Sequence, residues 1–330
     1  MRVIEHEFGR KCNRRHGEDQ RCSSACRRHD CHVALLPAPE WTDEQLLAAR
    51  NEGEARSRAR RREAGPKAFG LICRHLEPQV RRGLALSSNL RQITGDIFRD
   101  HPEIWQMFRY VCAPPVSQED FWTLVGGPKF RRVPAELADE AALALVDVVD
   151  PVRFPWVEQS RDPTPVELDA SVLATTCLWA AQFLGTQQRS ESSKRQEAAV
   201  GSALQEAGLT FDPSRSPAQF ADAMTRGTYS RERLLAGAKC DVPARLHDGR
   251  LMAIECKVSN GPKNGWKRVN REVGGKAQTW RSAFGNQVLT AVVLDGVFDL
   301  ASLKTARDGG VLVFWEYDLN PLKEFVVAAV

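Results

Sequence analysis

The chain has 330 residues, of which 42% are hydrophobic and 27% charged, and its net charge is +4 at pH 7. This length allows one large domain or two smaller ones, each with a sizeable core. No apolar run is long enough to span a bilayer, and charges stand where a signal peptide would be apolar, which predicts a cytoplasmic protein with no membrane partner. Basic residues cluster at 50–62 and 263–281, which favours a nucleic-acid partner.

Residues 1–37 are expected to form a basic arm that is rich in cysteine and histidine. Several of these side chains could act as zinc ligands: Cys12, Cys22, Cys26, Cys31, His16, His29 and His32. Their spacing matches no standard zinc finger, so the alternative is a disordered arm, or sequence upstream of the true start. The remaining cysteines stand singly in apolar contexts and are predicted to be reduced: Cys73, Cys112, Cys177, Cys240 and Cys256.

Residues 38–150 are predicted to be a mostly helical DNA-binding or accessory region. Thr42 and Gln45 form a capping-box pattern at the start of a helix that runs into the arginine-rich segment 50–62. This segment is either a solvated helical face or a contact to the DNA backbone. Apolar spacing predicts further helical structure over 67–112 and 134–149.

Residues 151–330 are predicted to form an α/β core. Two successive helices are expected between Thr164 and Gly208, followed by a loop-rich segment over 210–235. Strands are expected around Asp241 and over 251–258, 288–294, 311–315 and 323–330. A basic segment with a helical tail is expected over 263–284.

A predicted β-hairpin brings charged residues together in the middle of this core. Asp248-Gly249 is a strong signal for a tight turn between two strands. Because side chains alternate along a strand, Glu255 and Lys257 share one face. The opposite face is formed by Ile254, Cys256 and Val258. An acid and an amine in so apolar a strand cost free energy unless they pair or hold a metal, and Asp241 adds a second carboxylate.

Two carboxylates and a lysine can bind Mg²⁺ and activate water for phosphodiester hydrolysis. Asp241 and Glu255 are the expected ligands, with the backbone carbonyl of Cys256 as a third. Lys257 is expected to orient the attacking water, or to help deprotonate it, and to offset charge on the phosphate. The alternative is an ordinary solvated ion pair on a strand.

A further catalytic carboxylate is expected from the helix that precedes the hairpin. Glu197 is the best candidate, because Val200 and Leu204 define an apolar stripe and Glu197 falls near its edge. Glu191 is the second candidate. For both, the alternative is a glutamate that faces solvent.

The segment that follows the catalytic strand is predicted to contact DNA. Its basic residues are Lys263, Lys267, Arg268, Arg271 and Lys276. Lysine and arginine contact phosphates, while asparagine, glutamine and arginine read base edges in the major groove. The alternative is a solvated helix beside the sheet.

These residues resemble the PD-(D/E)xK nuclease superfamily, whose signature corresponds here to Cys240-Asp241 and Glu255-Cys256-Lys257. Cysteine stands where proline is common, at a position that is not a metal ligand. The chain is also similar to the XamI-type family of type II restriction endonucleases. The stretches that carry this resemblance are 153–182, 188–208 and 248–298, the last being the most specific.

The resemblance implies a PD-(D/E)xK-type mixed sheet flanked by helices. It implies Mg²⁺-dependent cleavage of double-stranded DNA at a short specific site, as part of a restriction-modification system. The implied partners are a cognate DNA methyltransferase and a second copy of the chain, since a two-fold protein matches a palindromic site. Two alternatives stay open: a structure-specific repair or recombination nuclease, and a non-catalytic DNA-binding protein.

Overall fold

The computed structural model describes residues 36, 37 and 39–330. The predicted Cys/His-rich arm and its zinc ligands lie outside these residues, apart from the last two positions of the arm. Where the chain is described, no helix combines the length and the apolar character needed to cross a membrane.

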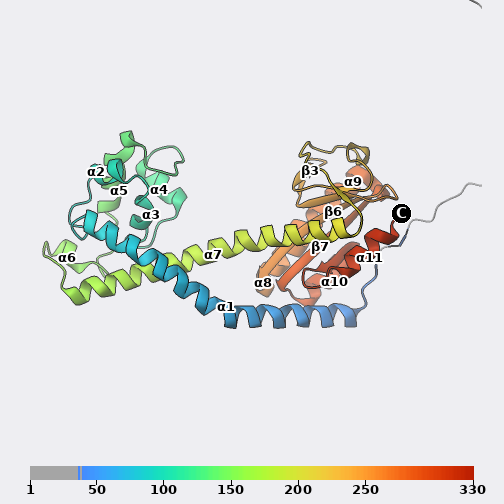
Figure 1. The fold of residues 1–330 in the computed structure, drawn as a ribbon, viewed down its shortest axis with the longest axis horizontal. Coiled ribbons are helices and arrows are strands. Elements are labelled where there is room, and N and C mark those ends of the chain that lie inside the picture. Colours follow the sequence, from blue (N-terminus) through green and yellow to red (C-terminus); the bar gives the residue numbers. More distant parts are fainter. Residues whose placement is uncertain (1–35, 38) are drawn as a thin grey trace, which may run out of the picture. The chain divides into compact units, whose positions relative to one another are not determined.

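The first part of the described chain is helical (Figure 1). Its α-helices are α1 (Asp43–Leu86), α2 (Gly95–Asp100), α3 (Trp105–Phe108), α4 (Gln118–Val125), α5 (Ala138–Val146), α6 (Pro155–Glu158) and α7 (Pro165–Glu206). Aromatic side chains fill the hydrophobic core among them, and Trp105 stacks on Phe121 with ring centroids 5.1 Å apart. We call this core the helical cluster. The predicted helical character is confirmed, and the helical structure expected over 67–112 consists of the end of α1, which stops at Leu86, followed by α2 and α3.

The helices α1 and α7 are long, with 44 and 42 residues, and each contributes to more than one hydrophobic cluster. The second half of α1 and the first half of α7 belong to the helical cluster. The start of α1 and the end of α7 pack on the β-sheet, through Leu46 and Val200 respectively. The capping box predicted at Thr42 is confirmed, and Thr164 caps α7 in the same way. Both helices therefore support the sheet as well as the helical cluster.

The prediction of two helices between Thr164 and Gly208 is wrong, because α7 runs without a break (Figure 1). The sequence suggests an interruption at the polar stretch around residues 186–195. Glutamine, glutamate, lysine and arginine are nevertheless good helix formers, and Gln187 donates a hydrogen bond to Glu191 one turn away, at 2.6 Å. Local propensity therefore continues the helix across a stretch that has no apolar stripe.

A six-stranded mixed sheet forms the second part of the chain, in the order β1-β2-β5-β6-β7-β8. Its strands are β1 (Thr210–Phe211), β2 (Thr228–Tyr229), β5 (Val242–Arg245), β6 (Leu251–Asn260), β7 (Val288–Val297) and β8 (Val311–Trp315). The strands β5 and β6 are antiparallel, whereas β6, β7 and β8 run parallel. A separate pair is formed by β3 (Arg233–Leu235) and β4 (Ala238–Cys240). The sheet and its flanking helices confirm the predicted α/β class.

The predicted hairpin is confirmed. The strand β5 pairs with β6 from Val242↔Ile254 to Arg245↔Leu251, and Gly249 has a φ of 92°, which glycine adopts without strain. The buried strands predicted over 288–294 and 311–315 are confirmed by β7 and β8.

The strand predicted over 323–330 is wrong, because this end of the chain is the helix α11 (Asn320–Ala328). Leu322, Phe325 and Val326 follow helical spacing and pack on the sheet. The β-branched residues near the end of the chain favour a strand locally, and this packing overrides that preference.

Helices cover both faces of β6. Met252, Ile254 and Cys256 pack with α7 and α11 in one hydrophobic cluster. Leu251 and Ala253 pack on the other face, with Trp280 of α9 (Gly274–Phe284). Glu255 and Lys257 alternate with the residues that face α7, so the two side chains share the opposite face of the strand, as the sequence predicts. This is the face that α9 covers.

Three continuous helical segments follow β6. They are α8 (Pro262–Trp266), the π-helical segment η3 (Lys267–Val273) and α9. The basic segment predicted to have only a helical tail is therefore helical from Pro262 onward. After β7, α10 (Leu300–Asp308) leads to β8 and packs with η3 and α9 on the sheet.

Candidate active site

Asp241 lies between β4 and β5, where the pairing of β5 with β6 ends at Val242↔Ile254. Its Oδ2 accepts a hydrogen bond of 2.8 Å from the backbone N–H of Cys256. Cys256 lies two residues beyond Ile254, where the pairing with β5 ends, so the carboxylate of Asp241 takes the place of a strand partner there. The same Oδ2 accepts a 2.8 Å hydrogen bond from Nζ of Lys257.

Glu255 and Lys257 are buried in β6, with 0% and 8% of their surface exposed. Nζ of Lys257 lies 2.7 Å from Oε2 of Glu255 and, at 2.8 Å, also contacts Asp241. The carboxylates of Asp241, just before β5, and of Glu255 in β6 therefore meet on one ammonium group. Buried charges are stable only when opposite charges lie close to them. Here the ammonium group compensates the two carboxylates, and the carboxylates compensate the ammonium group.

Lys276 of α9 is a second ammonium group at this position. Its Nζ lies 2.9 Å from Oε1 and 2.8 Å from Oε2 of Glu255. The side chain of Trp280, one turn further along α9, is fully buried and donates a 3.1 Å hydrogen bond to the carbonyl of Leu235. Because residues four apart share a helix face, this anchor turns Lys276 toward the sheet.

Lys276 is one of the residues predicted to contact DNA, but its ammonium contacts the buried Glu255 in the structure. The spacing of Lys276 to the apolar Trp280 was the signal that could have indicated this position. We call Asp241, Glu255, Lys257 and Lys276 the charged cluster from here on.

Burial and neighbouring charges shift the pKa values in the charged cluster. Burial raises the pKa of Glu255, an effect that Lys257 opposes and Asp241 reinforces. Burial by itself would lower the pKa of Lys257, but the adjacent Glu255 and Asp241 outweigh it and raise that pKa. Lys257 is therefore an ammonium at neutral pH, held between two carboxylates.

Glu197 is half-buried on α7, which covers the face of β6 opposite to α9. Its Oε1 accepts a 3.1 Å hydrogen bond from Ser193. Burial raises the pKa of Glu197. The charge of Asp241 raises this pKa further, and the charge of Lys257 lowers it. Glu197 thus lies near the charged cluster without a hydrogen bond to it. Glu191, the second candidate, is exposed.

The predicted DNA-contacting residues on α8 and η3 are open to solvent. Lys263, Lys267 and Arg271 are exposed, and Arg268 is half-buried. None of these side chains pairs with a carboxylate among residues 36, 37 and 39–330. Trp266, which the sequence analysis did not single out, is 51% exposed between the two lysines.

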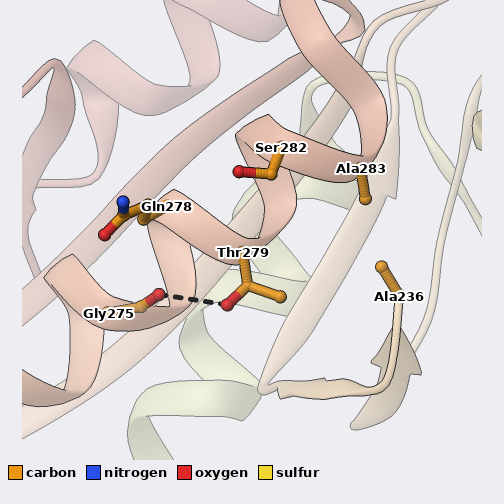
Figure 2. Close-up of a pocket in the computed structure, with 6 residues that line it drawn as sticks. All are labelled: Ala236, Gly275, Gln278, Thr279, Ser282 and Ala283. Atoms are coloured by element: carbon orange, nitrogen blue, oxygen red, sulfur yellow. Dashed lines mark hydrogen bonds between the residues drawn. The ribbon is translucent and has the colours of Figure 1, made fainter.

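A polar hollow of about 520 Å³ lies beside α9. Figure 2 shows Gly275, Gln278, Thr279 and Ser282 on α9, opposite Ala236 in the β3–β4 turn. Gly275 directly precedes Lys276 in the sequence, and Thr279 donates a 3.2 Å hydrogen bond to the carbonyl of Gly275. The hollow therefore opens next to the helix that carries the second ammonium.

No group of three or more His, Cys, Asp and Glu side chains in the described part of the chain is arranged to hold a metal ion. The donors at Asp241 and Glu255 nevertheless suit Mg²⁺, which is commonly held by one or two carboxylates, water and substrate phosphates. Full burial of Glu255 against two ammonium groups also indicates a position that demands positive charge. The residues present fit such a cation.

A second charged network, missed by the sequence analysis, joins both long helices to the sheet. Arg60 of α1 makes paired hydrogen bonds of 2.9 and 2.7 Å to Asp295 at the end of β7. Arg195 of α7 donates to Asp295 at 2.9 Å and to Glu316 at 2.7 Å. Arg195 is two residues from Glu197, so this network fixes the part of α7 that approaches the charged cluster.

Comparison with known proteins identifies the family and relatives of the chain. The chain matches the family described as XamI restriction endonuclease over residues 88–315. It is 35% identical to the type II restriction enzyme XamI of Xanthomonas campestris pv. amaranthicola over 184 residues, which are 54% of this chain and 67% of that protein.

A more distant relative covers more of the chain. The type II restriction enzyme SalI of Streptomyces albus G is 23% identical over 289 residues, which are 79% of this chain and 90% of that protein. No solved structure matches the chain. The family match covers well over half of the sequence, and we conclude that the chain belongs to the XamI restriction endonuclease family.

Proposed function

We propose that the charged cluster is the catalytic centre of this type II restriction endonuclease, and that it hydrolyses phosphodiester bonds of double-stranded DNA with Mg²⁺. One observation carries the proposal: Asp241, just before β5, and Glu255 of β6 contact the same Nζ of Lys257 at 2.8 and 2.7 Å. Two carboxylates and a lysine, placed where the pairing of β5 with β6 ends, supply cation ligands and a fixed positive charge together.

Asp241 and Glu255 would hold the cation through their carboxylates. The backbone carbonyl of Cys256 is a third candidate, because a residue in a strand directs its N–H and C=O to the same side, and the N–H of Cys256 already meets Asp241. When bound, Mg²⁺ supplies Lewis-acid activation of a phosphate oxygen and of the attacking water.

Lys257 would keep a positive charge beside the phosphate and orient the attacking water. Its position is fixed, because its carbon chain is buried in β6 and its ammonium is bound on two sides. A preorganised charge of this kind stabilises negative charge that develops during hydrolysis. Glu197 would act from α7, by accepting a proton or by holding a water near Asp241.

The exposed face of α8 and η3 would contact the DNA. Lys263, Lys267, Arg268 and Arg271 form no ion pair with described residues, so they remain available for phosphates. Trp266 between them suits apolar contact with a sugar or base. The helix α8 begins directly after β6, the strand that carries Glu255 and Lys257. DNA bound to α8 and η3 would therefore lie close to the charged cluster.

A restriction enzyme of this kind works with a partner that protects the host DNA. We propose a cognate methyltransferase in the same restriction-modification system, and a homodimer that matches a palindromic site. Measurement of the mass of the protein in solution, with and without DNA, tests the dimer. A homodimer should have twice the mass of one chain.

Digestion of a sequenced plasmid tests the activity. Purified protein with Mg²⁺ should give discrete fragments whose sequenced ends share one site, and EDTA should abolish them. Smeared products would point to a nuclease without a specific site, and preference for branched DNA would point to repair. Binding without any Mg²⁺-dependent cleavage would contradict a catalytic centre at this position.

A further inference from the structure

The single carboxylate of Glu255 contacts two ammonium groups, those of Lys257 and Lys276. Lys257 contacts only Oε2, whereas Lys276 contacts both oxygens, at 2.9 and 2.8 Å. An ionised carboxylate offers about four acceptor positions. The two ammonium groups occupy most of those that a buried carboxylate can present.

The charged cluster is balanced without any added ion. Asp241 and Glu255 contribute two negative charges, and Lys257 and Lys276 contribute two positive charges. A divalent cation that joined the cluster with Lys276 in place would face two ammonium groups at short range. Like charges in a partly buried site repel strongly, so Lys276 opposes binding of the cation.

Lys276, unlike Lys257, has room to leave. Its side chain is 27% exposed, compared with 10% for Lys257. Its neighbour Gly275 faces open space, and the polar hollow lies beside the same turn of α9 (Figure 2). The long, flexible lysine stem can therefore carry the ammonium from Glu255 into solvent, or to a phosphate, without a change in the backbone.

We infer that Lys276 is an internal counter-ion of the catalytic centre: in the free protein it occupies the oxygens of Glu255, and it must leave them before a divalent cation can bind. This inference rests on the proposed function, because it requires Glu255 to be a cation ligand. Lys276 thereby keeps the buried carboxylate compensated and holds the cation affinity of the DNA-free protein low.

A titration of the DNA-free protein with Mn²⁺, followed by calorimetry, tests this inference without any measurement of activity. Lys276→Met and the milder Lys276→Gln should each lower the Mn²⁺ dissociation constant about tenfold, because a charge that repels the cation is lost. Lys276→Arg, which keeps the charge, should stay near the wild type. Lys67→Met removes an exposed lysine of α1 and serves as the matched control, with an expected change below about twofold.

The wild-type protein offers a second measurement that does not depend on the folding of a variant. Acetylation of Lys276 by a lysine reagent, read by mass spectrometry, should increase when Mn²⁺ is added, whereas acetylation of the exposed Lys67 should not. Increased labelling at Lys276 alone would support its release from Glu255.

The outcomes separate this inference from the proposed function. If the wild type binds Mn²⁺ and Glu255→Gln abolishes binding, but Lys276→Met and Lys276→Gln bind no more tightly, the inference is overturned and the cation site stands. Unchanged labelling of Lys276 on Mn²⁺ addition overturns it equally. If neither the wild type nor any Lys276 variant binds Mn²⁺, the cation site itself fails, and the inference fails with it.

Discussion

The helical cluster and the sheet differ in the carboxylates that they bury. Aromatic and aliphatic side chains fill the helical cluster, whereas the buried carboxylates among the described residues, Glu255 and Asp295, both belong to the sheet. Buried charge costs free energy unless it is paired. The sheet therefore carries the cost of its buried carboxylates within β6 and β7, where chemistry is expected, while the helical cluster supplies stability.

The largest expected effect is on the rate of cleavage. Asp241→Asn keeps the shape of the side chain but removes a charge that would hold the cation, so Mg²⁺-dependent cleavage should fall at least about a thousandfold. Rates of plasmid cleavage measure the loss. Asp169→Asn, an exposed aspartate of the helical region, is the control and should cleave like the wild type.

A substitution in the helical cluster should act on stability instead. Trp105 is fully buried against Phe121 and Phe130, so Trp105→Ala should lower the free energy of unfolding by about 3–5 kcal/mol. Denaturant unfolding measures this change. Leu143→Ala, at a residue that is 69% exposed, should change it by less than about 0.5 kcal/mol. Equal effects of the two would remove the distinction between core and surface in this cluster.

The charged network at Asp295 should give an intermediate effect. Arg195→Met leaves Glu316 without its cation and Asp295 with only Arg60, and should cost about 1–3 kcal/mol of unfolding free energy. It should also lower cleavage, because α7 carries Glu197. Arg56→Met breaks the ion pair of Arg56 with Glu52 on α1, whose side chains are about half exposed. A loss of more than about 1 kcal/mol of unfolding free energy in this variant would contradict the ranking.

The smallest effect is a pH dependence at the start of α7. The hydrogen bond from Arg161 and the backbone N–H of Thr164 lower the pKa of Glu167 to about 2, from an ordinary value of 4.5. Since the folded pKa is the lower one, the stabilisation is present above about pH 4.5 and is lost as the pH falls toward 2. Glu167→Gln should therefore melt below the wild type at pH 6, with the difference shrinking at pH 3.

Melting temperatures across this range measure the effect. Glu136→Gln, at an exposed glutamate, should show no such trend. A constant difference between Glu167→Gln and the wild type from pH 6 to pH 3 would mean that the carboxylate charge is not responsible.

Sequence reasoning located the hairpin and its charges because these depend on local rules. Alternation along β6 fixes the common face of Glu255 and Lys257, and Asp248-Gly249 fixes the turn. The charged network at Asp295 was not foreseen, because its partners are 235 and 100 residues away along the chain. Such contacts depend on how the helices pack, which no local pattern encodes.

The errors at the two ends of this core have the same origin. The helix α11 and the unbroken α7 are set by packing and by continuous propensity, and the local signals for a strand and for a break were weaker than these. Lys276 shows the opposite case, because its helical spacing to Trp280 was readable but its charge suggested a surface role.

The most direct test of the catalytic centre is the rate of plasmid cleavage by Glu255→Gln, compared with the wild type at saturating Mg²⁺. Glu255 is fully buried and contacts both lysines, so the account predicts a loss of at least about a thousandfold in a folded protein. Cleavage within about tenfold of the wild type would contradict the assignment of the charged cluster as the site of hydrolysis.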